Sequence, residues 1–260
     1  MQIKEIQEGL TIEEMKNEIE KLLCRVERPG IGPLMKFLED EGFYEVPAST
    51  KYHSSFEGGL ALHSLFCYYY YQEMLSIMGG YVPSDSVIIE GLLHDICKID
   101  CYTKKGEPAS DKQLNYLASL IKKNNLAKKM KEEIGMLSEL DKNYASTLID
   151  WLLNHPEEDI PEKEEKWTWT EDYLPAGHGE KSVSILQRFI PLENRELLAI
   201  RWHMGAWEDG VANGSKGRSL NQAHKLFSDI GFLRIADGMA TFNEELEQSL
   251  VGEGELRLGI

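Results

Sequence analysis

The residues best suited to chemistry are His94 and Asp95, which stand side by side in the largely apolar stretch 88–97. A neutral imidazole is the commonest protein ligand for a transition metal. A buried carboxylate is costly unless it is paired with a positive group or binds a metal. The doublet therefore predicts a metal site whose remaining ligands come from elsewhere in the chain.

Four further residues of ligand type lie in separate stretches of the sequence: His63, His178, His203 and Asp237. Each histidine also has an ordinary structural explanation, because a core position, a loop between glycines or the C-terminal end of a helix can each hold one. Asp237 is more informative, since it lies on the apolar side of its predicted helix with Ile230 and Leu233. An aspartate in that position needs a partner.

Helical periodicity of the apolar residues predicts an all-α protein, with the ligand-type residues on or beside its helices. We expect helices over residues 11–28, 34–40, 58–78, 86–99, 183–190, 191–204 and 222–247. The first begins with Thr11 as its N-cap and Glu14 at the capping-box position. His63 falls within 58–78, the doublet within 86–99 and Asp237 within 222–247.

A change of composition marks an inserted helical subdomain, 107–155. Its three expected helices cover 110–121, 126–137 and 144–153, and its many lysines are more typical of a solvated face than of a binding surface. An acidic segment, 157–172, follows. The chain thus divides into N-terminal helices (1–44), a main domain (45–106 and 156–260) and the insertion. His155 has no ligand partner in helical register, and we expect it on the surface.

The composition is that of an ordinary soluble protein, with 42% hydrophobic and 28% charged residues. The net charge of −16 argues against a broad duplex-binding surface, yet a metal ion could supply the positive charge that a small nucleotide needs. Without a membrane-length apolar run or a signal core, we expect a cytoplasmic protein with no membrane partner. The four cysteines show no disulfide or zinc-knuckle pattern: Cys24, Cys67, Cys97 and Cys101.

The ligand-type residues, in their order along the chain, resemble the pattern of the HD superfamily of metal-dependent phosphohydrolases. The motifs that carry the resemblance are Gly58-Gly59-Leu60-Ala61-Leu62-His63, Gly91-Leu92-Leu93-His94-Asp95-Ile96-Cys97-Lys98 and Ala236-Asp237. His178 and His203 match the two extra histidines of the family's two-metal members. With His53 ahead of its glycines, the first motif is most similar to HD domains attached to bacterial 3′–5′ exoribonucleases. The resemblance covers about 45–107 and 172–245.

This resemblance implies an HD-domain helical bundle with a dinuclear metal site. One ion would be bound by His63, His94, Asp95 and Asp237, and the other by Asp95, His178 and His203, so that Asp95 bridges them. Lys98 would neutralise phosphate charge beside Asp95 in catalysis. His53, Glu180 and Lys181 would contact either the metal ligands or the substrate. Mixed histidine and carboxylate ligands suit Mn, Fe, Co or Ni, and Mg is also compatible. The implied reaction is hydrolysis of a phosphate ester in a phosphorylated small molecule, a nucleotide or a short oligonucleotide.

Other functions stay open at this point. Guanosine tetraphosphate hydrolases of the superfamily have acidic residues shortly after the doublet, where this chain has Lys98 and Ile99, so we do not expect that activity. One alternative is a di-iron oxygenase, since some HD proteins cleave C–P or C–C bonds with the same ligands. Another is a metal-binding regulatory module whose insertion recruits a partner. Lys98 itself has an alternative reading as a solvated lysine near a helix C-terminus. The sequence does not indicate the oligomeric state.

Overall fold

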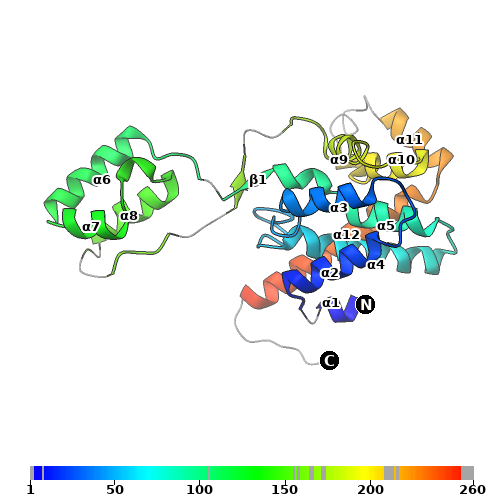
Figure 1. Cartoon of the computed structure of the whole chain (residues 1–260), viewed down its shortest axis with the longest axis horizontal. Coiled ribbons are helices and arrows are strands. Elements are labelled where there is room, and N and C mark those ends of the chain that lie inside the picture. The colour runs from blue at the N-terminus through cyan, green and yellow to red at the C-terminus, as the bar shows by residue number, and fades with distance from the viewer. Residues whose placement is uncertain are drawn as a thin grey trace. The chain divides into compact units, whose positions relative to one another are not determined.

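The structure, a computed structural model shown in Figure 1, describes residues 3–7, 9–104, 106–154, 156, 159–163, 167–170, 174–207, 214 and 217–252. It divides into a first unit, residues 1–102 and 170–260, and an inserted unit, residues 103–169. Nearly all of the regular structure is helical, so the prediction of an all-α fold is confirmed. His155 and part of the acidic segment 157–172 lie outside the described residues. Among the described helices, none combines the length and the apolar character that crossing a bilayer requires.

The first unit is built around α4 (Gly59–Met78), a helix that is apolar on most of its faces, as predicted for a central helix. α12 (Ile230–Gly252), α5 (Ser84–Leu93) and α2 (Ile12–Leu23) pack against it. The side chains of Leu60, Leu65 and Phe66 on α4 are completely buried. α1 (Ile3–Gln7) and α3 (Ile31–Asp40) belong to the same unit (Figure 1).

The N-terminal helices begin and end partly where the sequence predicted. Thr11 caps α2 as predicted, because its hydroxyl accepts from the Glu14 N–H while the Glu14 carboxylate accepts from the Thr11 N–H. α2 ends at Leu23 rather than near residue 28, since the chain continues in tight turns in which Val26 N–H donates to the Leu23 carbonyl. α3 begins earlier than expected because Pro33 fits into the first turn of a helix, where its missing N–H is not needed.

The C-terminal part of the first unit contains a helix break that the sequence did not reveal. Its elements are α9 (His178–Leu186), α10 (Asn194–Trp202), the 3₁₀ turn η3 (Gly205–Trp207), α11 (Gly217–Leu226) and α12. The prediction of one helix over 222–247 is therefore wrong. Arg195 on α10 holds the break, since it pairs with Asp229 and lies over the ring of Phe227. Leu226 is exposed in consequence, whereas Ile230 is buried as expected.

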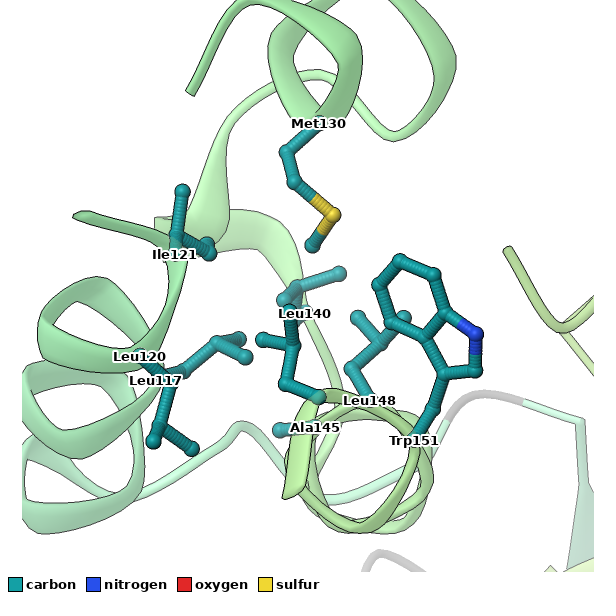
Figure 2. Close-up of a cluster of buried hydrophobic side chains, with 9 residues drawn as sticks. Leu117, Leu120, Ile121, Met130, Leu140, Ala145, Leu148 and Trp151 are labelled. Carbon is teal, nitrogen blue, oxygen red and sulfur yellow. The ribbon is translucent and has the colours of Figure 1, made fainter. Parts of the chain in front are cut away.

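The inserted unit has a hydrophobic core of its own, shown in Figure 2. Its elements are α6 (Asp111–Lys123), α7 (Ala127–Glu133), the 3₁₀ turn η2 (Leu137–Glu139) and α8 (Lys142–Asn154), which lie where three helices were predicted. The buried side chains of Leu117, Met130, Leu148 and Trp151 meet between these helices. A cluster contributed by every helix of the unit indicates that its fold is held together from within.

A pair of short strands lies where the chain enters and leaves the inserted unit. β1 (Tyr102–Thr103) and β2 (Thr168–Trp169) form the one sheet within the described ranges. The Thr170 N–H donates to the Cys101 carbonyl at 3.0 Å, and the Thr168 hydroxyl donates to the Thr103 carbonyl at 3.3 Å. The strands are therefore antiparallel. The predicted insertion, 107–155, lies inside the unit that these strands delimit.

Candidate metal centre

The His94-Asp95 doublet lies at a break between two helices rather than inside one. α5 ends at Leu93, and a 3₁₀ helix, η1 (Ile96–Asp100), begins directly after Asp95. The expected helix over 86–99 is thus two elements. In a continuous helix, neighbouring side chains diverge by about 100°. The break at Asp95, with φ −106° and ψ 18°, lets both side chains of the doublet face the same interior point.

His94 and His203 are positioned by the same local device. His94 is the C-cap of α5 and His203 is the C-cap of α10. The Nδ1 atom of His94 lies 3.0 Å from the carbonyl oxygen of Gly91, and that of His203 lies 2.7 Å from the carbonyl oxygen of Ile200. A carbonyl oxygen can only accept, so each Nδ1 carries the hydrogen when the imidazole is neutral. Each Nε2 then presents a lone pair, as metal ligation requires.

His63, on α4, is oriented by a carboxylate, Glu244, that was not among the predicted site residues. Its Nδ1 lies 2.9 Å from Glu244 Oε1, and the hydroxyl of Ser54 donates to Glu244 Oε2 at 2.6 Å. Glu244 is buried on α12, two helical turns after Asp237. That spacing was the signal that could have identified it, because residues seven apart on a helix share a face.

The ligand-type atoms converge at the spacing of a metal coordination shell. His63 Nε2 lies 3.2 Å from Asp237 Oδ1 and 3.9 Å from Asp95 Oδ2. His94 Nε2 lies 3.7 Å from Asp95 Oδ2 and 4.0 Å from Asp237 Oδ1. His203 Nε2 lies 3.2 Å from Asp95 Oδ1. Ligand atoms about 2.1 Å from one transition-metal ion are roughly 3.0 Å apart when adjacent and roughly 4.2 Å apart when opposite.

The hydrogen bonding of the three histidines also favours a bound cation. The Nε2 atoms of His63, His94 and His203 are buried, and none has a well-directed hydrogen bond to another described residue. Buried polar atoms are normally satisfied, so three such nitrogens beside two carboxylates need an explanation. Bound transition-metal ions would provide one, because they accept such lone pairs. The donor set therefore fits a metal.

The charges at the centre also favour a cation. Burial opposes ionisation of both carboxylates. Lys98, His94 and His203 outweigh it at Asp95 and hold the carboxyl pKa below its usual range. At Asp237 the histidines alone do so. Burial likewise opposes a charge on His63, but Glu244 and Asp237 raise its pKa to about 10. This raised pKa reflects the negative charge around His63, which also favours a metal ion. Burial lowers the pKa of His94 to about 4 and keeps it neutral.

Lys98 is not the solvated lysine of the alternative interpretation. It is 8% exposed, and its Nζ lies 2.7 Å from Asp95 Oδ2. Burial opposes its charge, but Asp95 outweighs this effect and raises the pKa of Lys98, so the side chain stays protonated. Lys98 lines a cavity of about 620 Å³ over the centre, together with Asp95, Asp237 and His203.

His178 lies at the start of α9 and also lines this cavity. Its Nδ1 is 3.4 Å from the Sγ of Cys97, a residue that was not among the predicted ligands. One ligand atom each from His178, Cys97 and Asp95 lies within 4.8 Å of the others, and the same holds for His94, Asp95 and His203. Asp95 is thus common to two groups. The predicted second-ion set joined His203 with His178, whereas the structure groups His203 with His94.

The two remaining candidates occupy different surroundings. His53 lines the cavity, with its ring centroid 5.0 Å from that of His63. Burial, together with the charges on His63 and Lys98, lowers the pKa of His53 to about 4. Lys181 is buried, and its Nζ contacts Asp100 and lies 3.7 Å from the Sγ of Cys101. It is not among the described residues that line the cavity, so its position fits a structural contact better than a substrate contact.

The chain matches no protein-family model, no curated protein and no solved structure.

Proposed function

We propose that the protein is a metal-dependent phosphohydrolase or phosphodiesterase of the HD type, acting on a nucleotide or a short oligonucleotide. The observation that carries this proposal is the shared orientation of His63, His94 and His203. In each, Nδ1 is tied to an acceptor and Nε2 faces Asp95 or Asp237. Fixing the far nitrogen of a histidine is how proteins orient a metal ligand.

Each residue has a definite part in this proposal. His63, His94, Asp95 and Asp237 would hold the first ion, and Asp95, His178 and His203 would hold the second. When bound, these ions would supply Lewis acidity toward a phosphoryl oxygen and lower the pKa of a water molecule. Asp95 belongs to both ligand sets, which makes it the residue on which the reaction depends most.

Lys98 and His53 are the proposed substrate contacts beside the ligands. The protonated Lys98 keeps Asp95 ionised and places a positive charge in the wall of the cavity, where an anionic phosphate would bind. His53 is neutral at pH 7, because its pKa is lowered to about 4, and its role is therefore hydrogen bonding rather than charge neutralisation. With this mixture of nitrogen and oxygen donors we expect Mn, Fe, Co or Ni in preference to Mg.

The test is metal content measured beside hydrolysis. The purified protein is analysed for bound metals and assayed with Mn²⁺ on p-nitrophenyl phosphate, bis-p-nitrophenyl phosphate and a panel of nucleotides. We expect bound transition metal, and loss of both metal and hydrolysis in Asp95→Asn. Asp40→Asn, at an exposed position on α3, is the matched control and should retain both.

Each alternative function gives a different result in the same experiment. Full hydrolysis by Asp95→Asn, or hydrolysis without any metal, would contradict the proposal. Oxygen uptake by an iron-loaded sample, without hydrolysis in Mn²⁺, would identify an oxygenase instead. Metal binding without turnover of any substrate would favour a regulatory module.

A further inference from the structure

The lining of the cavity over the metal centre is of two kinds, with buried ligand-type residues and exposed apolar residues. Its volume of about 620 Å³ lies in the range of cavities that hold drug-sized ligands, so it has room for more than a phosphate group. The inner wall carries the ligand-type residues. An outer wall is formed by Trp207 on η3 and by Arg234, Ile235 and Phe242 on α12. The two walls therefore suit chemically different parts of one ligand.

The outer wall exposes large apolar side chains. Trp207 is 84% exposed, Phe242 is 69% exposed and Ile235 is 46% exposed. Ile235 and Phe242 are seven residues apart on α12 and share a face of that helix. Exposed aromatic rings beside a phosphate site are the surfaces on which nucleic-acid bases stack.

Arg234 is the cation of this outer wall. Its side chain is exposed, and it forms no hydrogen bond or ion pair with any other residue that the structure describes. The arginine stem packs over Gly205, where an added Cβ would lie 2.7 Å from Cδ and 2.8 Å from Nη1 of Arg234. Gly205 has a φ of 55°, which also favours glycine. The backbone of η3 thus leaves room for the arginine.

The placement of Arg234 suits a second anion. Arg234 and Asp237 are one helical turn apart on α12 and line the same cavity. A guanidinium matches a phosphate with two parallel hydrogen bonds. In a chain with a net charge of −16, an exposed arginine that no described acid neutralises is available to an anionic ligand.

We propose that the outer wall is a subsite for an aromatic base and a second phosphate, so that the protein prefers substrates carrying both beyond the phosphate at the centre. This inference rests on the proposed function and narrows its substrate class. Trp207 and Phe242 contact the base, and Arg234 binds the second phosphate. A 5′-mononucleotide lacks the second phosphate, whereas a nucleoside diphosphate and a 5′-phosphorylated dinucleotide both have one.

Calorimetric titration of the full chain in Mn²⁺ tests the subsite without requiring turnover. The probes are nonhydrolysable phosphonate analogues of a 5′-mononucleotide, a nucleoside 5′-diphosphate and a 5′-phosphorylated dinucleotide. We expect one or both ligands with a second phosphate to bind about tenfold more tightly than the mononucleotide. The ligand that binds more tightly shows whether the second phosphate is part of a diphosphate or of an internucleotide linkage.

Variants assign the effect to named side chains. Arg234→Gln should abolish the advantage of the second phosphate, and Arg234→Lys should keep part of it, because a lysine retains the charge but not the paired hydrogen bonds. Arg188→Gln, at an exposed arginine outside the cavity, is the matched control and should keep all of it. Trp207→Ala should weaken binding of the mononucleotide relative to ribose 5-phosphonate by about fivefold or more.

The outcomes separate this inference from the proposed function. Equal affinity for all three ligands, or an undiminished advantage in Arg234→Gln, overturns the subsite. If the protein hydrolyses phosphate esters and yet shows that equal affinity, the proposed function stands and the subsite is wrong. If the expected binding pattern appears without hydrolysis of any ester, the subsite stands and the proposed function is wrong.

Discussion

Glu244 Oε1 lies 2.9 Å from Nδ1 of His63, on the side of the imidazole away from Nε2, which faces Asp237. The carboxylate therefore fixes the orientation of the imidazole ring and makes Nε2 a stronger electron-pair donor to a metal ion. We expect Glu244→Gln to weaken metal binding by roughly 10–100-fold, the usual effect of losing such a partner. Competition with a chromophoric chelator measures the change.

The control for this prediction is Glu73→Gln, which alters an exposed glutamate on the same helix as His63. It should leave metal affinity unchanged. Wild-type affinity in Glu244→Gln, with unchanged helical circular dichroism, would show that Glu244 does not position the ligand.

Metal stoichiometry distinguishes one ion from two. Asp95 belongs to the group with His94 and His203 and to the group with Cys97 and His178, whereas His178 belongs only to the latter. We expect two ions in the wild type, one in His178→Ala and none in Asp95→Ala, measured by equilibrium dialysis and mass spectrometry. His203→Ala should chiefly weaken the second ion. A single ion in both the wild type and His178→Ala would reassign His178 to substrate contact.

Glu90 gives the first unit a pH-dependent stability. Burial raises the pKa of this glutamate to about 7 from 4.5, although Tyr71 and Arg195 oppose the shift through hydrogen bonds of 2.6 Å and 3.4 Å. Between these two pH values the folded chain holds a proton that the unfolded chain has released. The free energy of unfolding therefore falls as the pH rises through this window, by on the order of 3 kcal/mol, and is flat above it.

Urea unfolding of the wild type and of Glu90→Gln at pH 4.5, 6 and 8 measures this contribution. The free energy of unfolding of the wild type, relative to that of Glu90→Gln, should fall as the pH rises, because the glutamine cannot ionise. Glu73→Gln serves again as the exposed control and should show no such trend. A difference between wild type and Glu90→Gln that is independent of pH would contradict the prediction.

The inserted unit should be removable. Thr103 and Thr168 are opposite each other in the strand pair, so an Asn-Gly turn can replace residues 104–167. Because the unit has its own core, we expect the shortened chain to keep its helical circular dichroism and its metal affinity. Loss of metal affinity in a folded, shortened chain would show that the insertion supports the centre.

Leu148→Ala in the full chain provides the matched test of independence. Leu148 is completely buried in the core of the inserted unit, and its truncation should cost about 2–5 kcal/mol there. Differential scanning calorimetry should show that loss in one transition only, with metal affinity unchanged. A parallel shift of both transitions would mean that the two units unfold together.

The sequence was most informative where a local pattern has a single physical meaning. The capping box at Thr11 and the burial of Ile230 and Leu233 on the side of the helix that carries Asp237 both follow from neighbours within two helical turns, and both are found in the structure. The break between α11 and α12 depends on Arg195, which is distant in sequence, so periodicity could not reveal it. Cys97 was missed for a related reason, because its proximity to His178 is created by packing alone.

The convergence of the ligand-type residues has a consequence for the stability of the fold. His63 and Asp237 lie on α4 and α12, which are joined by most of the sequence, yet their side-chain atoms are 3.2 Å apart. An ion shared by them would act as a cross-link that closes a very long loop, and long loops are the ones whose closure costs the unfolded chain most entropy. Free metal at about 100 times its dissociation constant would add about 2.7 kcal/mol to the free energy of unfolding. The bound metal would then stabilise the folded state in addition to its proposed role in the reaction. Chelators would therefore lower the melting temperature of the first unit.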